Sequence, residues 1–153
     1  MDATRQQLLD FLRHHQVLTV AVVTAAGRPH AAALFYAVDD RLRFYVLTEP
    51  STRHGAVLAG PAGVAGTVQA DRQRWWEIQG VQFRGQCRPL NGAAQARGWE
   101  IYGARFPFVK PASRVLQGRL VKMTLWRIEP TWFRLIDNRR GFGHKTEWRR
   151  RAR

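Results

Sequence analysis

The feature that most constrains the fold is a series of short apolar segments with strand-like alternation, separated by turns. Candidate strands lie at 17–24, 30–38, 42–47, 64–70, 80–90, 120–130 and 131–138. Short helices are expected at 2–15, about 52–59 and 91–104, the last with Asn91 as its cap, and one further short turn is expected at 113–118. Because these strands do not alternate with long helices, a parallel α/β sheet is disfavoured. We therefore expect a mainly β protein, a six- or seven-stranded antiparallel β-barrel with a few short helices.

The length and composition of the chain predict one domain without a membrane segment. A chain of 153 residues can bury a substantial core, and no apolar run approaches the ~20 residues of a membrane-spanning helix. The first residues also lack the apolar centre of a signal peptide, so we expect a cytoplasmic protein. The single cysteine, Cys87, is expected to pack as a small apolar group. No metal site is expected, because His14 and His15 have no third ligand in a motif with them.

The charge is strongly basic and unevenly distributed. The chain has 25 Lys and Arg against 11 Asp and Glu, which suggests attraction to phosphate groups. Residues 134–153 hold eight basic and two acidic residues and end in WRRRAR. We therefore expect a folded domain at 1–145 and a disordered, solvated basic tail at 146–153.

A polar loop in the first half of the chain supplies groups that bind anions. The loop follows the strand that ends at Leu47 and contains Thr48, Ser51, Thr52 and Arg53. Ser51 or Thr52 can cap the next helix, whose N-terminus favours a phosphate, and a guanidinium can bind two phosphate oxygens at once. The same residues also suit an ordinary capped helix with a solvated arginine, so the residues alone leave both interpretations open.

Small and aromatic side chains mark other positions where a ligand could approach. The strand HAAALFYAV at 30–38 has three consecutive alanines, which admit either a flat group or a neighbouring helix. Gly66 indicates a bulge or another close approach inside its strand. Trp75 and Trp76 would point to opposite faces of a strand, so one of them would need a second subunit or a planar ligand as its partner.

The order of these segments resembles the FMN-binding split-barrel family that includes pyridoxamine 5'-phosphate oxidase. The resemblance rests on HAAALFYAV, LRFYVLT, STRHGAVLAGP, VAGTVQ and IQGVQFRG, taken in this order. The later segments YGARFPF, LWRIEPTWFRLIDN and GFGHK are similar to an uncharacterised branch of that family. The likeness spans nearly the whole chain, and the order and spacing of the motifs carry it more than any one motif does.

The resemblance implies a homodimer with two flavins between the subunits. It places the second strand along the flavin ring, at His30, Ala31, Ala32 and Ala33. The phosphate would be held in the next loop by Thr48, Ser51, Thr52 and Arg53, and Leu47 before them would belong to the cofactor site. Gln82 would approach the ring from the partner chain, and Lys145 with His144 would close the pocket.

The expected function is that of an FMN flavoprotein, an oxidoreductase acting on an unknown small molecule. No hydrolytic motif is visible in the sequence, and no catalytic side chain is assigned, because a flavin carries out hydride or electron transfer itself. The oxidase uses an Arg-x-His element to hold pyridoxamine phosphate, whereas this chain has Arg134, Leu135 and Ile136 there. We therefore do not expect a true pyridoxamine phosphate oxidase.

Three alternatives remain open at this point. A reductase of the same fold could use the deazaflavin F420, and a flavin- or haem-binding barrel could act only as a sensor or a store. A barrel that binds nucleic acid is less expected; it would use the basic end of the chain for phosphates and interleaved aromatics for stacking. Those aromatics are Trp132, Phe133, Phe142 and Trp148.

Overall fold

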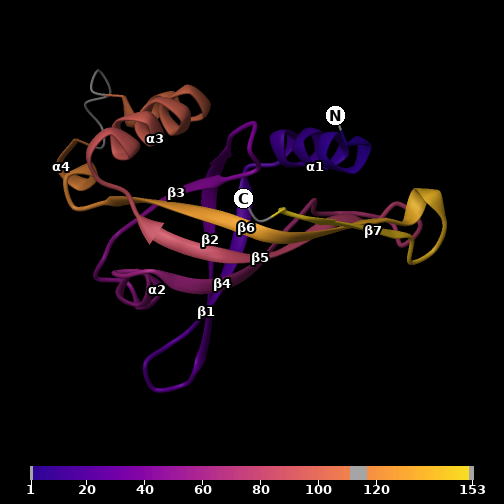
Figure 1. The fold of residues 1–153 in the computed structure, drawn as a ribbon, viewed down its shortest axis with the longest axis horizontal. Helices are drawn as coiled ribbons and strands as arrows, with labels where there is room; N and C mark the ends of the chain where they lie inside the picture. The colour runs from indigo at the N-terminus through magenta and orange to yellow at the C-terminus, as the bar shows by residue number, and fades with distance from the viewer. Residues whose placement is uncertain (1, 111–116, 152–153) are drawn as a thin grey trace.

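The computed structural model describes residues 2–110 and 117–151, which form seven β-strands and four α-helices (Figure 1). The strands are β1 (Val17–Val23), β2 (Pro29–Val38), β3 (Phe44–Thr48), β4 (Ala62–Gln69), β5 (Gln79–Pro89), β6 (Thr124–Asp137) and β7 (Lys145–Arg149). The helices are α1 (Ala3–His14), α2 (Arg53–Val57), α3 (Gly92–Arg105) and α4 (Gln117–Leu120). Short 3-10 turns lie at Pro107–Val109 and Asn138–Arg140. None of the helices described has the length and apolar character required to cross a membrane.

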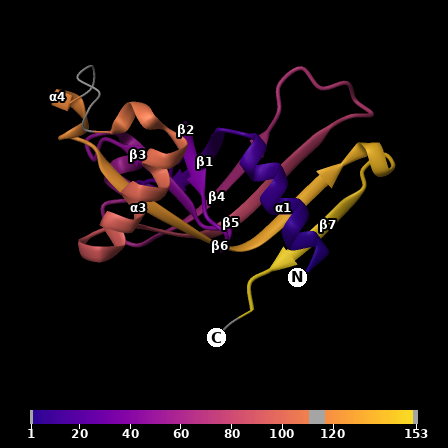
Figure 2. The ribbon, with the colours of Figure 1, turned by 90° about the horizontal axis from the view of Figure 1, so that it is seen from above.

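The strands form one antiparallel sheet that closes on itself. Their order is β3-β2-β1-β4-β5-β6-β7, and β3 also pairs with β6 from Phe44 opposite Ile128 to Thr48 opposite Thr124. This pairing closes six strands into a barrel, while β7 pairs with the second half of β6 and lies outside it (Figures 1 and 2). The expected mainly β antiparallel barrel is therefore confirmed.

The barrel core is filled by inward side chains of the strands and by one face of α1. Leu8, Leu9, Phe11 and Leu12 are the buried positions of α1, and they join the core residues of the barrel. Asp2 caps this helix by accepting a hydrogen bond from the Thr4 amide at 3.0 Å. The Tyr36 hydroxyl donates to the Leu12 carbonyl at 2.7 Å, which ties the end of α1 to β2. Figure 2 shows α1 crossing the sheet near β7.

A second apolar cluster lies outside the barrel, under α3. Tyr102 and Phe106 at the end of this helix pack with Ala37 of β2, Tyr45 of β3 and Leu125 of β6. Asn91 precedes the helix as expected, but its side chain makes no capping hydrogen bond. The helix thus depends on this packing, because Gly98 and Gly103 inside it lower its intrinsic helix propensity.

The two strands expected at 120–130 and 131–138 form the single long strand β6. Pro130 was expected to separate them, because proline cannot donate a backbone hydrogen bond. In the structure, Pro130 lies opposite Gly85, next to a shift in the register between Arg84 and Gly85. An irregularity of this kind leaves one position without a ladder hydrogen bond, so a proline can stand inside the strand.

The disordered tail expected at 146–153 is wrong for its first residues. Lys145–Arg149 form strand β7, which pairs with β6 from Ile136 to Trp132. Trp148 packs against Phe133 at 5.9 Å between ring centroids, and the two oxygens of Glu147 accept from Arg134 at 2.7 Å and from the Trp132 indole at 3.1 Å. Alternating charged and aromatic residues therefore pair with an existing strand here, in spite of the basic composition.

Strand β4 passes so close to its neighbours that Gly66 leaves no room for a side chain. A Cβ atom at Gly66 would overlap Phe83 Cζ and the Thr19 carbonyl oxygen. Gly63 lies in the same strand, and a Cβ there would have Gln86 Nε2 as its nearest neighbour, at 3.8 Å. The close approach expected at Gly66 is thus present, and it comes from the barrel itself.

Gly66→Ala is expected to lower the free energy of unfolding by about 1–3 kcal/mol, because β1 or the Phe83 ring must shift to accept the methyl group. Gly63→Ala is the matched control, with an expected change of about 0.5 kcal/mol or less. Urea denaturation of both variants measures the difference. Equal losses of unfolding free energy in the two variants would contradict the close approach at Gly66.

Candidate functional site

The loop between β3 and α2 is held in shape by its own hydrogen bonds. The Thr52 hydroxyl donates to the Glu49 carbonyl at 2.8 Å and accepts from the Gly55 amide at 3.0 Å, so Thr52 is the N-cap of α2. Of the two caps that the sequence left open, Thr52 is the one used. The helix has only five residues, and its dipole alone is a weak source of anion binding.

A buried histidine lies at the centre of this loop. His54 is 8% exposed, and its Nε2 atom lies 2.9 Å from the Thr48 hydroxyl and 3.2 Å from the Thr52 hydroxyl. Its ring stacks on His30 of β2, with ring centroids 5.8 Å apart and ring planes at 8°. Burial and then the neighbouring His30 lower the pKa of His54. The loop is thereby attached to the end of β2.

Ser51 and Arg53 are the loop residues that face solvent. Both are exposed, and the Ser51 hydroxyl makes only a long contact of 3.3 Å with the Glu49 carboxylate. Within residues 2–110 and 117–151, no carboxylate forms an ion pair with Arg53. Their hydrogen-bonding groups are therefore available to a ligand, whereas those of Thr48 and Thr52 are used inside the protein.

An uncovered face of the barrel includes the outward residues of β2, the first of which, Ala31, follows His30 in the chain. Residues paired across antiparallel strands share a face, and Ala31 pairs with Ala21 of β1, which pairs with Ala65 of β4. We call this surface the small-residue face; its members are Thr19, Ala21, Ala31, Ala33, Ala65, Thr67 and Gln82. All of them are exposed or half-buried. The alanines let a flat group lie close to the strands over this face.

The small-residue face contains a shallow hollow of about 320 Å³. Ala21, Ala65 and Thr67 belong to its lining, and Gln82 lies at its β5 side. Arg84 lies over the Trp132 ring at 4.5 Å and completes the lining. The hollow is thus bordered by a fixed cation and by a side-chain amide.

The structure places the residues predicted on β2 on two opposite faces. Ala31 and Ala33 belong to the small-residue face, as a ring-binding strand requires. His30 and Ala32 point the other way, since they pair with the buried Val22 and Val20 of β1. The ring contact that the resemblance implied for four consecutive residues can therefore involve only alternate ones.

The remaining predicted residues do not meet in one chain. Leu47 is half-buried in β3, and it packs against the apolar cluster under α3. Gln82 lies on β5 in the small-residue face, with β1 and β4 between it and β2. Lys145 begins β7 and is exposed. Figure 1 shows α2 and the turn before β7 toward opposite ends of the long axis, so Arg53 and Lys145 are far apart in a single chain.

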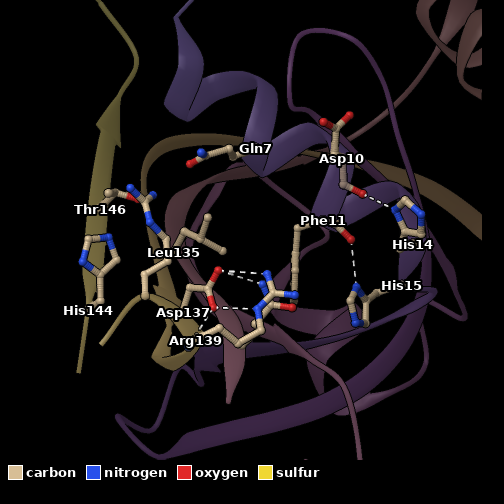
Figure 3. A pocket seen from close by; sticks show the side chains of 12 residues that line it. Gln7, Asp10, Phe11, His14, His15, Leu135, Asp137, Arg139, His144 and Thr146 are labelled. Atoms are coloured by element: carbon tan, nitrogen blue, oxygen red, sulfur yellow. Dashed lines mark hydrogen bonds and ion pairs between the residues drawn. The ribbon is translucent and has the colours of Figure 1, made fainter. Parts of the chain in front are cut away.

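A larger hollow of about 860 Å³ lies between α1, the end of β6 and the start of β7 (Figure 3). Asp137 lies in it, and its carboxylate accepts two hydrogen bonds from the Arg139 guanidinium at 2.9 Å and one from Gln79 at 3.1 Å. The bonds from Arg139 are the main reason that the pKa of Asp137 is lowered. His144 lines the same hollow, and its buried Nε2 has no hydrogen-bond partner among the described residues.

This larger hollow was not identified as a site from the sequence. Its residues come from α1, β5, β6 and β7, which are far apart in the chain, so no local motif marks it. The nearest sequence signal was GFGHK, in which His144 and Lys145 were expected to close a flavin pocket. The structure places His144 beside α1, at the end of the molecule away from Arg53.

Three exposed aromatic side chains, Trp75, Trp76 and Phe142, gather at the same end of the molecule. Trp75 and Trp76 lie in the loop between β4 and β5, where both are exposed and their rings meet edge to face at 5.4 Å. The prediction that they lie on opposite faces of a strand is wrong, because both belong to this loop. Asn138 orders this loop by donating to the Trp75 carbonyl at 2.6 Å. Phe142 is 82% exposed and its ring lies 6.0 Å from that of Trp75.

The structure gives little support to nucleic-acid binding through Trp132, Phe133, Phe142 and Trp148. Trp132 and Phe133 are buried, and Trp148 is half-buried against Phe133. Only Phe142 presents an open ring face. Cys87, as expected, is buried in the core, and burial raises the pKa of its thiol to about 12.

The closed antiparallel barrel, with one outside strand and an uncovered face beside a polar loop, is that of a split-barrel protein. A family model described as pyridoxamine 5'-phosphate oxidase matches residues 4–137. The chain therefore belongs to the pyridoxamine 5'-phosphate oxidase family, as its motifs indicated. A UPF0306 protein of Klebsiella pneumoniae is 39% identical over 122 residues, which cover 79% of this chain and 77% of that relative.

Solved structures share the fold at low sequence identity. A Clostridium acetobutylicum protein related to general stress protein 26, of the pyridoxinephosphate oxidase family, superposes with a TM-score of 0.65 at 14% identity. The match covers 95% of this chain and 93% of that chain. A heme binding protein from Mycobacterium smegmatis gives a TM-score of 0.67 at 15% identity, over 97% of this chain and 59% of that chain. At these identities the likeness concerns the fold alone.

The residues present fit the FMN that this fold family implies. A phosphate needs donors that are free to reach it, and Ser51 and Arg53 are exposed on the loop. A flat ring needs a floor without large side chains, which Ala31, Ala33 and Ala65 provide. Thr48 and Thr52 do not fit a direct phosphate contact, because their hydroxyls are engaged with His54.

His54→Gln is expected to reduce the pH dependence of stability. The pKa of His54 is lower in the folded than in the unfolded chain. The contribution of neutral His54 to the free energy of unfolding is therefore complete above the unfolded pKa of about 6.5. It is lost as the pH falls below that value toward the lowered folded pKa. The difference in unfolding free energy between wild type and His54→Gln should therefore shrink from about pH 7.5 to about pH 5.5. Urea titrations at several pH values measure it.

His14→Gln is the control for this measurement, because His14 is exposed on α1. The change in pH dependence assigned to His54 is the part that the His14→Gln variant does not reproduce. A constant difference between wild type and His54→Gln over the whole range would contradict the lowered pKa.

Proposed function

We propose that the chain is an FMN-binding protein that acts as a homodimeric oxidoreductase on a small molecule. One observation carries the proposal: an outward floor of small side chains on β2 follows directly after His30, which holds a loop with an exposed hydroxyl and a guanidinium that has no ion pair within residues 2–110 and 117–151. The stacking of His54 on His30 holds that loop at the end of β2, whose next outward residue is Ala31. A ligand with a flat ring and a phosphorylated chain has the complementary form.

The residues have separate roles in this proposal. Arg53 binds two phosphate oxygens with its guanidinium, and the Ser51 hydroxyl donates to a third. The side chains of Ala31 and Ala33 are small, so they leave the space above β2 open and let the ring approach the strand backbone. A bound FMN supplies hydride or electron transfer. The protein then needs no general base, and its residues bind and orient.

A second copy of the chain completes the site. Within one chain, β1 and β4 separate Gln82 from β2. Lys145 begins β7, and Trp75 contacts Phe142 in the turn before β7, which lies toward the end of the molecule opposite α2 (Figure 1). In an isologous dimer the same surface serves both subunits, so an interface that contains the loop and the far end brings the far end of one chain to the loop of its partner. Phe35 and Val17, paired at the edge of the small-residue face and 48% and 43% exposed, are apolar surface that such a dimer would cover.

Haem and a deazaflavin are the alternatives that the fold leaves. Haem iron takes an axial ligand such as histidine, cysteine, methionine or tyrosine. None of these residue types occurs among the members of the small-residue face, and His30 and His54 turn away from it. This chemistry favours FMN over haem at this face. A deazaflavin has a similar shape and is separated from FMN by the absorption spectrum of the copurified molecule.

Arg53→Ala is expected to weaken FMN binding about tenfold or more, because a charge-assisted contact to the phosphate is lost. Arg97→Ala is the matched control; Arg97 is an exposed arginine of α3 that pairs with Glu100, and its loss should leave the affinity unchanged. Quenching of flavin fluorescence measures the dissociation constant. If the purified protein is colourless and does not quench flavin fluorescence, the proposal is wrong; if it binds haem instead, the haem alternative replaces it.

Ala33→Glu is expected to make the protein monomeric at micromolar concentration and to weaken FMN binding in parallel. The substitution places a charge in the centre of the proposed interface, where its desolvation is unfavourable. Ala93→Glu is the control, on the exposed start of α3. Sedimentation velocity gives the oligomeric state. A dimer that persists in Ala33→Glu would show that the small-residue face is not the interface.

A further inference from the structure

The hydrogen bonds around His54 determine which of its ring nitrogens carries the proton. Thr52 has one hydroxyl hydrogen, and the hydroxyl donates it to the Glu49 carbonyl at 2.8 Å. The same oxygen accepts from the Gly55 amide at 3.0 Å. Toward His54 Nε2, at 3.2 Å, it therefore has only a lone pair to offer. This contact is a hydrogen bond only if Nε2 carries the hydrogen.

The contact between His54 and Thr48 is compatible with the same assignment. Thr48 Oγ1 lies 2.9 Å from Nε2 and can accept from it, so one N–H is shared between two threonine hydroxyls. In a neutral ring this leaves Nδ1 as the unprotonated nitrogen. Nδ1 forms no hydrogen bond within the described residues. The Thr52 contact therefore favours the tautomer of His54 that carries its proton on Nε2.

We propose that His54, in its Nε2-protonated form, is the positioning residue of the anion-binding loop, and that Thr48 and Thr52 act only through it. This inference rests on the proposed function where it assigns ligand contact to Ser51 and Arg53. Where it concerns the shape of the loop, it rests on the hydrogen bonds of His54 alone. A loop held by a buried ring presents Ser51 and Arg53 in one fixed arrangement, which suits a terminal phosphate monoester.

His30 gives this arrangement a connection to the small-residue face. Its ring is parallel to that of His54, and it belongs to the strand that carries Ala31 and Ala33. The titratable or charged groups next to His54 are His30 from β2 and, on the loop itself, Glu49 and Arg53. Protonation of His54 adds a hydrogen at Nδ1 and leaves the Nε2 donor in place. The threonine contacts therefore persist below the pKa of the ring.

The first test uses the protein without any ligand. In a sample with ¹⁵N-labelled histidine near neutral pH, His54 should show a protonated Nε2 and an unprotonated Nδ1 in long-range proton–nitrogen spectra. Thr48→Val removes one acceptor and should speed hydrogen exchange of the Gly55 amide, whereas Thr48→Ser keeps the hydroxyl and should not. A protonated Nδ1 with a bare Nε2 would overturn the proposal, as would equal exchange rates in the two variants.

The second test compares two amide replacements for His54 by FMN binding. The amide nitrogen of glutamine reaches the position of Nε2 and can donate to both threonines, whereas asparagine is one carbon shorter. His54→Gln should stay within about threefold of the wild-type dissociation constant, and His54→Asn should raise it about tenfold or more. Equal losses in both variants would overturn the positioning role.

Combining each change with Thr48→Val separates a positioning residue from a direct contact. His54→Asn and Thr48→Val should be non-additive, because both remove the same support. Ser51→Ala should add independently to Thr48→Val, because Ser51 contacts the ligand. Additive effects of His54→Asn and Thr48→Val would refute the shared support. If FMN fails to bind the wild-type protein, the proposed function is wrong, while the spectra and exchange rates still decide whether His54 holds the loop.

Discussion

The pairing of β3 with β6 is the constraint on which the rest of the structure depends. It closes the barrel, and it fixes the end of β3 at Thr48 opposite Thr124. The loop that follows is therefore held at one end by a sheet. Its other end is held by α2, where the Trp126 indole of β6 donates to the Leu58 carbonyl at 2.7 Å. One strand of the barrel thus fixes both ends of the candidate anion site, and β3 and α2 need little stability of their own.

Alternation in the sequence was sufficient to predict most of the barrel. The β1–β5 segments and α1 follow local patterns of apolar and polar residues, and each was predicted within a few residues of its position. Leu42 shows the limit of this reasoning: it was expected in β3, but it is buried in a turn with a φ of 57°. Burial and strand conformation are separate properties, and an apolar pattern reports only the first.

The errors at the C-terminal end have the same origin. Pro130 is tolerated inside β6 because the register with β5 shifts beside it, where Pro130 lies opposite Gly85 and Trp132 opposite Arg84, and local alternation around Pro130 does not predict this shift. Strand β7 exists because β6 offers it an open edge from Trp132 to Ile136 beyond the end of β3. The pattern of one segment does not contain the open strand edge that its neighbour provides. Basic composition alone therefore predicts a tail where the structure has a strand.

The candidate site was predictable to the extent that its chemistry is local. The cap at Thr52 and the free groups of Ser51 and Arg53 depend on residues within a few positions of each other, and a capping motif predicts them. The central position of His54 depends on Thr48 and on His30, and His30 comes from another strand. The sequence therefore indicated which residues form the loop, and the packing between β2 and α2 separates those that face solvent from those that hold the loop.

The separation of the polar groups along the barrel has a thermodynamic consequence. If one flavin contacts Arg53 of one chain and Gln82 of another, ligand binding and dimer formation are linked equilibria, and each strengthens the other by the same factor. The small-residue face then serves both purposes, because small side chains that admit a ring also leave apolar strand surface for the partner. A barrel with a large net positive charge gains from this arrangement, since a bound phosphate lowers the repulsion between two subunits of +14 each. Cofactor and assembly are then parts of one equilibrium, with the phosphate neutralising charge where the two copies meet.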